Sequence, residues 1–264
     1  MVFDIKTIAD LSLNAWPSHQ MQVYDGWIIR FSHFYTHRTN SVEQIGPSAL
    51  PLPEKIEYCE QIYRRWNTPS IFKITPLSHP LLEPLLIEQG YHMEHSTDVM
   101  VLDLENEYNY IEETRTIPLK IQHHIAPSWI EGLFQLKGTT DPVHRKIVPS
   151  MYAAIPKDVI SISIRKKGIQ IGTGLGILDR DYIGIYAIHV ADEYRHRGYA
   201  SAIIHTLLSE GAKSGATKAY LQVVSNNTPA LNLYQKIGFR KLYTYWFRVK
   251  EQKCASHILA TSMN

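Results

Sequence analysis

RHRGYA at residues 195–200 and NTPALNLYQKIGF at residues 227–239 are the two stretches that decide the fold of this chain. The first follows a strand predicted at 182–190 and opens a helix predicted at 199–213. Apolar side chains of this helix recur at the spacing of an amphipathic helix, at Ile203, Ile204, Leu207 and Leu208. One helix, one strand and one turn therefore separate the two stretches.

The start of the helix at 199–213 is a predicted anion-binding site. The first N–H groups of a helix have no intrahelical acceptor, and the helix dipole adds positive potential there. Small residues at Gly198 and Ala200 let a diphosphate approach the backbone, and Arg195 and Arg197 add cationic donors. A basic turn before a helix is also an ordinary structural feature, so the prediction depends on the second stretch as well.

The elements around both stretches predict an α/β fold with a mixed sheet. Strands rich in Ile, Tyr and Val are predicted at 170–178, 182–190, 219–224 and 239–249. Asn227 is the predicted N-cap of a helix at 228–236, and Pro229 lies in its first turn. Gly238 occupies the left-handed position that ends such a helix. Strands that alternate with helices indicate a mixed α/β sheet.

Together the two stretches resemble the signature segments of the GNAT superfamily of acyl-CoA N-acyltransferases. These segments read Q/R-x-x-G-x-G/A and N-x-x-A-x-x-L-Y-x-K-x-G-F, and the second matches residues 227–239 at every named position. The resemblance implies a GNAT-like fold over 117–250, with a central mixed β-sheet of splayed strands flanked by helices. It also implies acetyl-CoA/coenzyme A as co-substrate and an amine as acceptor.

The resemblance also implies a role for each matching residue. The exposed backbone of Ile188, His189 and Val190 would bind the pantetheine arm as an added strand, because this strand splays from its neighbour. The pyrophosphate would be held by the loop residues Arg195, His196, Arg197, Gly198, Tyr199, Ala200 and Ser201. Asn227 would lie beside the cofactor arm, and Tyr234 would protonate the leaving thiolate. From the residues alone, Tyr234 can also be read as a core tyrosine of its helix.

Attack of a neutral amine on a thioester requires an oxyanion donor, a proton for sulfur and a general base. A backbone N–H near Val190 is the predicted oxyanion donor. The base stays open, because the strand positions of substrate-facing parity include Gly184 and Tyr186 but no carboxylate. Tyr186 could relay a proton through water or serve packing alone. His189 has the opposite parity, so its side chain is predicted to be structural.

The chain contains an internal repeat. A gap-free offset of 148 positions places Gly90 on Gly238. The same offset matches Gly26 with Gly174, Val42 with Val190, and the helix predicted at 53–65 with 201–213. We therefore predict two related halves, each with the order strand, strand, helix, strand, helix and a final strand pair.

The repeat predicts the domain organisation. A degenerate GNAT-like domain is predicted at 1–116, a catalytic N-acetyltransferase domain at 117–250 and a polar tail at 251–264. The boundary is placed within 105–116, which is acidic and poor in aliphatic residues. Apolar strand faces such as that of Val99 need covering, so we expect the two halves to pack as one body.

The first half lacks the residues that would hold the cofactor. The segment PSALPL at 47–52 stands where the loop stands in the second half, without arginine or glycine and with two prolines that lack N–H donors. Leu86 stands where Tyr234 stands. We therefore predict that this half binds no coenzyme A.

A polar-aromatic segment of the first half resembles a segment of tandem GNAT proteins whose leading domain is degenerate. Trp27, Arg30 and Arg38 belong to it and are candidates for a wall of the acceptor pocket, where an arginine could bind a carboxylate. The alternative is a surface strand and turn capped by Asn40.

Composition narrows the function. The 264 residues are 44% hydrophobic and 20% charged, which is typical of a globular protein with a sizeable core. The net charge of +2 and the scattered basic residues predict no nucleic-acid partner. No stretch has the roughly 20 apolar residues of a membrane span, no secretory signal is predicted, and 2 cysteines form no disulfide framework. These features predict a cytoplasmic protein, and 13 histidines without an HExxH or paired spacing predict no metal site.

The leading hypothesis is acetylation of a primary amine of a small molecule by direct attack in a ternary complex. Two alternatives stay open: acetylation of a protein N-terminus or lysine, and a non-catalytic acyl-CoA-binding sensor. An open, shallow acceptor groove would favour a protein acceptor, and a cleft closed by the first half would favour a small molecule. A proton donor at Tyr234 disfavours a sensor. Nothing in the sequence indicates an oligomer.

Overall fold

The computed structural model describes residues 3–106, 108 and 117–251. Most of the boundary predicted within 105–116, and all of the predicted tail beyond residue 251, lie outside these residues. The elements before the boundary are α1 (Ile5–Ala15), β1 (Gln20–Tyr24), β2 (Trp27–Phe31), η1 (His37–Thr39), β3 (Val42–Gln44), α2 (Leu52–Arg65), β4 (Ser70–Ile74), α3 (Leu82–Glu88) and β5 (His92–Asp103). Those after it are β6 (Leu119–Gln122), α4 (Pro127–Lys137), α5 (Pro142–Ala153), β7 (Asp158–Lys166), β8 (Ile169–Asp179), β9 (Tyr182–Val190), η2 (Asp192–Tyr194), α6 (Tyr199–Lys213), β10 (Lys218–Val224), α7 (Thr228–Ile237) and β11 (Arg240–Lys250).

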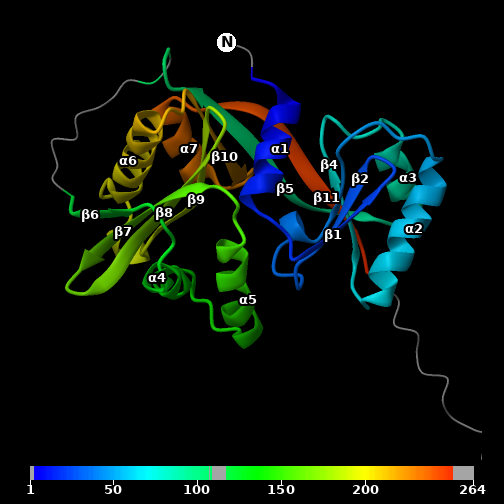
Figure 1. Cartoon of the computed structure of the whole chain (residues 1–264), viewed down its shortest axis with the longest axis horizontal. Coiled ribbons are helices and arrows are strands. Elements are labelled where there is room, and N and C mark those ends of the chain that lie inside the picture. Colours follow the sequence, from blue (N-terminus) through cyan, green and yellow to red (C-terminus); the bar gives the residue numbers. More distant parts are fainter. Residues whose placement is uncertain (1–2, 107, 109–116, 252–264) are drawn as a thin grey trace, which may run out of the picture.

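One sheet unites both halves (Figure 1). Within the described residues it has 11 strands in the order β1-β2-β3-β4-β11-β5-β10-β9-β8-β7-β6. Two strands are exchanged: β5 of the first half lies between β10 and β11, and β11 of the second half lies between β4 and β5. The expected packing of the halves as one body is thus confirmed, but it arises from shared backbone hydrogen bonds in the sheet as well as from packed faces.

Helices cover both faces of the sheet, and alternate side chains of each strand face one layer or the other. On β5, Met100 and Leu102 belong to the core beneath α6 and α7, whereas Val99 and Val101 pack with α1. Helices α4 and α5 pack on β8 beside the end of α1, where Ala15 joins their cluster. Helices α2 and α3 cover the strands of the first half. The period of two along β5 therefore assigns its residues to two separate cores.

The elements predicted in the second half are confirmed. Helix α6 and strand β9 have the predicted bounds, and the other predicted elements of this half end within one residue of the predicted positions. The predicted order omits α1 and one of the three strands before α2 in the first half, and it omits β6, α4, α5 and β7 in the second. The final strand pair predicted for each half is wrong: one long strand, β5 or β11, stands in its place among the described residues. The repeat offset spans only part of each half, so it carried no information about the omitted helices.

The repeat alignment holds from α2 onward and is wrong before it. Shifted by 148 positions, α2, β4, α3 and β5 fall on α6, β10, α7 and β11. Gly26, however, lies in the β1–β2 turn with φ of 74°, whereas Gly174 lies within β8. A Cβ at Gly174 would come within 2.2 Å of Ile203 Cγ2, so this glycine allows α6 to pack closely on the sheet. The two glycines are therefore not structural equivalents.

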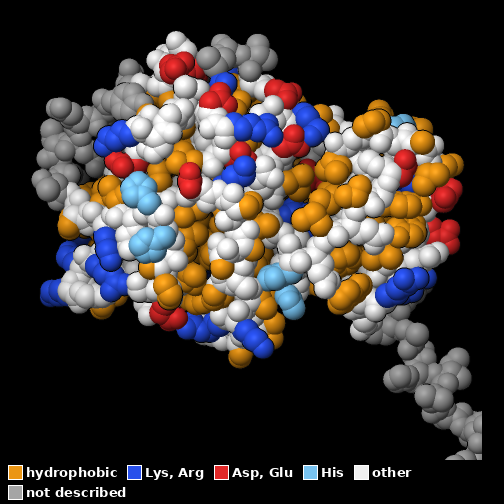
Figure 2. Space-filling model, in the orientation of Figure 1, with side chains coloured by type: hydrophobic (Ala, Val, Ile, Leu, Met, Phe, Trp, Pro, Cys, Tyr) orange, Lys and Arg blue, Asp and Glu red, His pale blue; other side chains and the backbone are white. Residues whose placement is uncertain are grey.

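The surface shows no single basic stripe on the face seen in Figure 2. Lys and Arg side chains lie there in several separate places, and hydrophobic side chains spread over the part formed by the first half. Among the helices that the structure describes, none combines the length and apolarity needed to cross a bilayer.

Candidate active site

Strands β9 and β10 splay apart, as the sequence predicts. Their parallel pairing runs from Tyr182 opposite Lys218 to Ile185 opposite Leu221 and then stops, although both strands continue. The N–H of Ala191, directly after β9, donates to Ile171 O within β8 at 2.9 Å. Since successive N–H groups of a strand point to opposite sides, the N–H of Val190 points toward the open side. This edge can accept an extended ligand in the manner of an added strand.

A β-bulge at Ala187 changes the direction of the side chains that follow. On β8, Leu175 pairs with Tyr186 and Thr173 pairs with His189, so Ala187 and Ile188 together oppose a single residue. Ala187 has φ of 49°, and its carbonyl accepts a hydrogen bond from Thr173 Oγ1 at 3.0 Å. The extra residue reverses the alternation along the rest of β9.

The bulge overturns the predicted orientation of the His189 side chain. Simple alternation places Tyr186 and His189 on opposite faces, yet both line one cavity. Ile188 and Val190 instead pack against the core beneath α6 and α7. The Ile188–Val190 segment therefore presents an open backbone edge on one side and the His189 imidazole on the acceptor side. Neither the residue types nor the period of the strand indicates a bulge at an alanine.

The loop before α6 forms a run of backbone donors. His196 has φ of 58° and Gly198 has φ of 85°, and both lie in the left-handed region. From His196 to Ser201, no N–H group donates to a backbone or side-chain acceptor among the described residues. A Cβ at Gly198 would meet nothing within 4 Å, so the space beside it is open. The loop is exposed and has the geometry expected of a diphosphate cradle.

The two arginines of this loop lie at its rim. Arg195 pairs with Asp192 at 2.7 Å, and both side chains are largely exposed. The Arg197 guanidinium lies 5.6 Å from the centre of the Tyr194 ring. An exposed pair of this kind contributes little to stability, so Arg195 can exchange its partner for a ligand phosphate at low cost.

Helix α7 positions Asn227 and Tyr234. The Asn227 side chain accepts from the N–H of Ala230 at 3.3 Å and caps the helix, as predicted, while Gly238 ends it with φ of 113°. Tyr234 is buried in the core against which Ile188, Val190 and Tyr199 pack. Burial raises the pKa of Tyr234 to about 12, so the phenol keeps its proton at physiological pH.

A cavity of about 330 Å³ lies on the other side of β9. The first half contributes Ala15, Trp16, Tyr35, Thr36 and Arg38 to its lining. The second half contributes Leu133, Lys137, Tyr152, Leu175, Ile177, Tyr186, Ala187 and His189. Both halves thus enclose a space that opens on the bulge of β9.

Of the three first-half candidates, only Arg38 lines this cavity. Arg30 is buried and donates to Ser18 Oγ, to Arg38 O at 2.7 Å and to Trp16 O, so its guanidinium holds the loop rather than facing a ligand. Trp27 is 1% exposed, and the Lys55 ammonium lies 4.0 Å from its ring centre in the core of the first half. Trp27 and Arg30 are therefore absent from the lining of this cavity.

Two polar side chains that line the cavity, Tyr186 and His189, can take part in proton transfer. The Tyr186 hydroxyl lies 2.8 Å from the hydroxyl of Tyr220. The pKa of His189 is lowered to about 4, chiefly by burial and further by the positive charges of Lys137 and Arg195. His189 is therefore neutral above about pH 4 and offers a lone pair across the physiological range. The bulge is the reason that the sequence did not reveal this candidate base.

A larger cavity of about 510 Å³ lies elsewhere, among α4, α5 and β7. Its lining includes His123 and His124 but none of the residues predicted to bind coenzyme A or to act on the thioester. Volume alone does not identify a reaction site, so the cavity beside the splayed strand is the better candidate.

A separate group of His37, Glu94 and His95 brings atoms that could ligate a metal ion within 4.8 Å of one another, at a place that no sequence spacing indicated.

In the first half, the chain itself occupies the loop that corresponds to residues 195–200. The Asp25 carboxylate accepts from the N–H groups of Ala49 and Leu50 at 3.0 Å and from Ser48 Oγ at 2.6 Å. These hydrogen bonds, led by that of Ser48, lower the pKa of Asp25. The Lys55 ammonium lies 3.2 Å from the same carboxylate. An internal anion thus uses the donors that a diphosphate would need.

Splayed strands, a loop of unpaired amides before α6 and a tyrosine on α7 define a GNAT-type acyltransferase. The chain belongs to the family described as "Probable histone acetyltransferase Rv0428c C-terminal", whose model matches residues 3–247. It is 25% identical over 252 residues to "Uncharacterized N-acetyltransferase YobR" of Bacillus subtilis (strain 168), covering 94% of this chain and 99% of that protein. The protein is thus an acetyltransferase of the GNAT type.

Solved structures confirm the fold. A GCN5-related N-acetyltransferase from Kribbella flavida matches 96% of this chain and 98% of its own, with a TM-score of 0.71 and 13% identity. A tandem GNAT protein from the clavulanic acid biosynthesis pathway matches 72% of this chain and 66% of its own, with a TM-score of 0.61 and 12% identity. At these identities the likeness concerns the fold alone.

Proposed function

We propose that this protein transfers the acetyl group of acetyl-CoA to a primary amine of a small molecule, by direct attack in a ternary complex. The observation that carries the proposal is the position of β9 between a loop of unpaired amides and a cavity enclosed by both halves. In this scheme residues 117–250 are the catalytic part, and residues 1–116 are a degenerate partner that closes the acceptor cavity.

The described residues fit acetyl-CoA at three places. The amides of residues 196–201 would hold the diphosphate, and the open space beside Gly198 leaves room for it. The free edge of β9 beyond Ile185 would bind the pantetheine arm. Asn227 would lie beside that arm. When bound, the group supplies an activated thioester carbonyl.

The side chains around β9 supply the proton transfers. The amine nitrogen attacks the thioester carbonyl and loses a proton to neutral His189, directly or through water, with Tyr186 as an alternative relay. The Val190 N–H stabilises the oxyanion. The C–S bond then breaks, and Tyr234 donates a proton to the thiolate. The amide and free coenzyme A are the products.

A thiol-release assay with a panel of amines tests the proposal. We expect acetyl-CoA to be consumed only in the presence of a small primary amine, with one acetylated product for each thiol released. Tight binding of acetyl-CoA without turnover of any amine would favour a sensor. Turnover of histone or other peptide substrates, without turnover of free amines, would favour a protein acceptor, as the family description suggests.

Replacement of Tyr234 by phenylalanine removes one hydroxyl and almost no packing volume. We expect kcat to fall by about 10²-fold, toward the lower end of general acid catalysis, because a phenol of raised pKa is a weak acid that water can partly replace. The dissociation constant for acetyl-CoA should change little. Tyr24→Phe, far from the site in β1, is the matched control. An unchanged kcat with chemistry rate-limiting would remove Tyr234 from the mechanism.

Replacement of His189 by glutamine keeps the backbone edge and removes the proton acceptor. We expect kcat to fall by about 10²-fold. The ratio of wild-type to variant kcat should be the same at every pH from 6 to 9, because a group of pKa about 4 does not titrate in that range. His123→Gln, at an exposed histidine, is the control. A loss that appears only above about pH 6 and shrinks at lower pH would show that His189 titrates near its ordinary pKa, and an unchanged kcat would make it structural.

A further inference from the structure

The cavity beside β9 carries positive charge without a compensating acid. This inference rests on the proposed function. Arg38 and Lys137 line the cavity, and its lining includes no aspartate or glutamate among the described residues. Lys137 is exposed at the mouth, where it donates to Tyr35 Oη at 2.9 Å. Neither cation forms an ion pair with any described carboxylate. An acceptor that enters the cavity therefore meets two cations and no anion.

Apart from Arg30, whose guanidinium donates to Ser18 Oγ and to two backbone carbonyls, the other buried or half-buried lysines and arginines that the structure describes are paired with carboxylates. Lys73 is 2.8 Å from Glu43, and Arg248 is 2.6 Å from Glu83. The same holds for Lys55 with Asp25, Lys157 with Asp179, Lys218 with Asp181 and Lys250 with Glu60. A desolvated cation is costly unless an anion or several acceptors compensate it. By this standard Arg38 lacks an anionic partner. A ligand carboxylate could fill that role.

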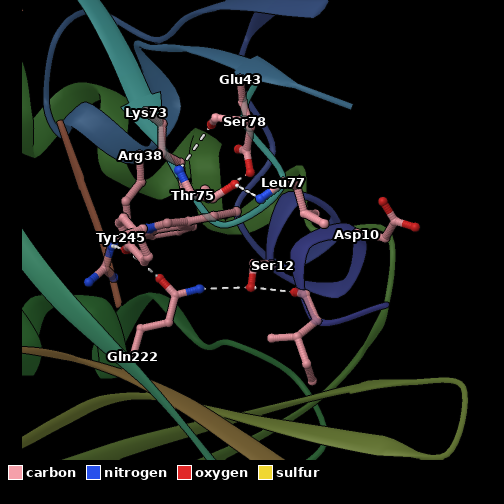
Figure 3. Close-up of polar contacts among 12 residues, drawn as sticks. Asp10, Ser12, Arg38, Glu43, Lys73, Thr75, Leu77, Ser78, Gln222 and Tyr245 are labelled. Carbon is pink, nitrogen blue, oxygen red and sulfur yellow. Dashed lines mark hydrogen bonds and ion pairs between the residues drawn. The ribbon is translucent and has the colours of Figure 1, made fainter. Parts of the chain in front are cut away.

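A chain of hydrogen bonds holds Arg38 in place (Figure 3). Its Nε donates to Tyr245 Oη at 3.0 Å, and Tyr245 Oη donates to Gln222 Oε1 at 2.7 Å. Gln222 Nε2 in turn donates to Ser12 Oγ at 2.7 Å. The Lys73 ammonium lies 4.6 Å from the Tyr245 ring centre and fixes the tyrosine from the side of β4. Only Nε of Arg38 is used in this chain.

The terminal nitrogens of Arg38 remain for a ligand. No described residue accepts a hydrogen bond from them. Two parallel N–H groups of a guanidinium match the two oxygens of a carboxylate, and such charge-assisted pairs are among the strongest hydrogen bonds in proteins. The Arg38 chain spans α1, β10 and β11. Pre-organisation of this kind lowers the entropic cost of binding a carboxylate.

We propose that the acceptor is an amino acid-like molecule, a primary amine that also bears a carboxylate. Arg38 binds the carboxylate, and Lys137 attracts it at the cavity mouth. The amine then lies toward the bulge of β9 and His189. Aromatic walls from Trp16, Tyr152 and Tyr186 suit an apolar side chain between the two ends. Polyamines and lysine-rich peptides are disfavoured, because a second ammonium finds no carboxylate in the cavity.

Kinetics on matched pairs of amines test the proposal. Each free amino acid is compared with its carboxamide and with the amine that lacks the carboxyl group, and an aminophosphonate and a polyamine complete the panel. For the wild-type protein we expect kcat/KM to be higher for the carboxylate by about tenfold to a hundredfold, the usual contribution of a hydrogen bond to a charged group. Preference for the polyamine, the carboxamide or the phosphonate would overturn the proposal.

Substitutions at Arg38 separate charge from fold. In Arg38→Gln we expect the preference for the carboxylate over its carboxamide to disappear, with the KM for acetyl-CoA maintained. Arg38→Lys should recover part of the preference, because it restores the charge without the planar fork. An equal loss for charged and neutral amines in both variants would instead indicate a purely structural role for Arg38 and would contradict the proposal.

A binding measurement keeps this inference distinct from the proposed function. N-acetylated amino acids and their amides are titrated into the complex of the wild-type protein with coenzyme A. Tighter binding of the anion supports the carboxylate site, and equal binding overturns it. Absence of turnover with every amine would contradict the proposed function. Turnover of amines without preference for a carboxylate would contradict this inference alone.

Discussion

Replacement of Gly198 by aspartate is expected to abolish acetyl-CoA binding, raising the dissociation constant by about 10²-fold or more. The new carboxylate would lie beside the amides of residues 196–201 and would repel a diphosphate from the space that Gly198 leaves open. A side chain at φ of 85° adds backbone strain. Isothermal titration with acetyl-CoA measures the effect directly and also reports the number of sites.

Gly215→Asp is the matched control for this experiment. Gly215 lies just beyond the other end of α6, has φ of 93° and also meets nothing within 4 Å of an added Cβ. The control therefore introduces the same charge and similar strain without a diphosphate nearby. We expect this variant and the wild-type protein each to bind one acetyl-CoA per chain. Normal binding by a folded Gly198→Asp variant would show that the loop assignment is wrong.

A stoichiometry of one follows from the state of the first half. There Asp25 accepts from Ala49 and Leu50, so the donors that correspond to the loop before α6 are occupied. A second acetyl-CoA per chain would contradict this view and the predicted loss of function in the first half.

The fragment 117–264 is expected to be inactive and largely insoluble. It lacks β5, which lies between β10 and β11 in the sheet of the whole protein. Two long strands would then expose unpaired backbone edges, and the apolar side chains that pack with Met100, Leu102, Val99 and Val101 would meet water. The free energy lost in this way exceeds the free energy of unfolding of most domains, which is about 5–15 kcal/mol.

Co-expression of 1–116 with 117–264 is the control. Because the break falls at the predicted boundary between the halves, the two pieces can still exchange β5 and β11. We expect the pair to co-purify and to recover acetyl transfer that 117–264 alone lacks. Size-exclusion chromatography, circular dichroism and thiol release measure assembly, folding and activity. A monomeric fragment 117–264 with full activity would make the first half dispensable.

The sequence by itself determined the GNAT fold and the loop before α6, because their signals are local. A glycine at 198 marks a left-handed residue before a helix, and Asn227 and Gly238 mark the start and end of α7. The period of α6 likewise predicted its buried face. Such features depend on backbone geometry and on neighbours within a few residues, so they can be read along the chain.

Only the tertiary structure decided how the two halves come to line one cavity. The exchange of β5 and β11 depends on pairing between strands more than a hundred residues apart, which no local pattern encodes. The bulge at Ala187 adds one residue to the alternation of β9 and turns His189 into the cavity, although alanine rarely adopts φ of 49°. Arg30 and Arg38 are the same residue type eight positions apart, yet one is bonded to carbonyls and the other lines the cavity. Their different roles follow from the groups that surround each guanidinium after folding.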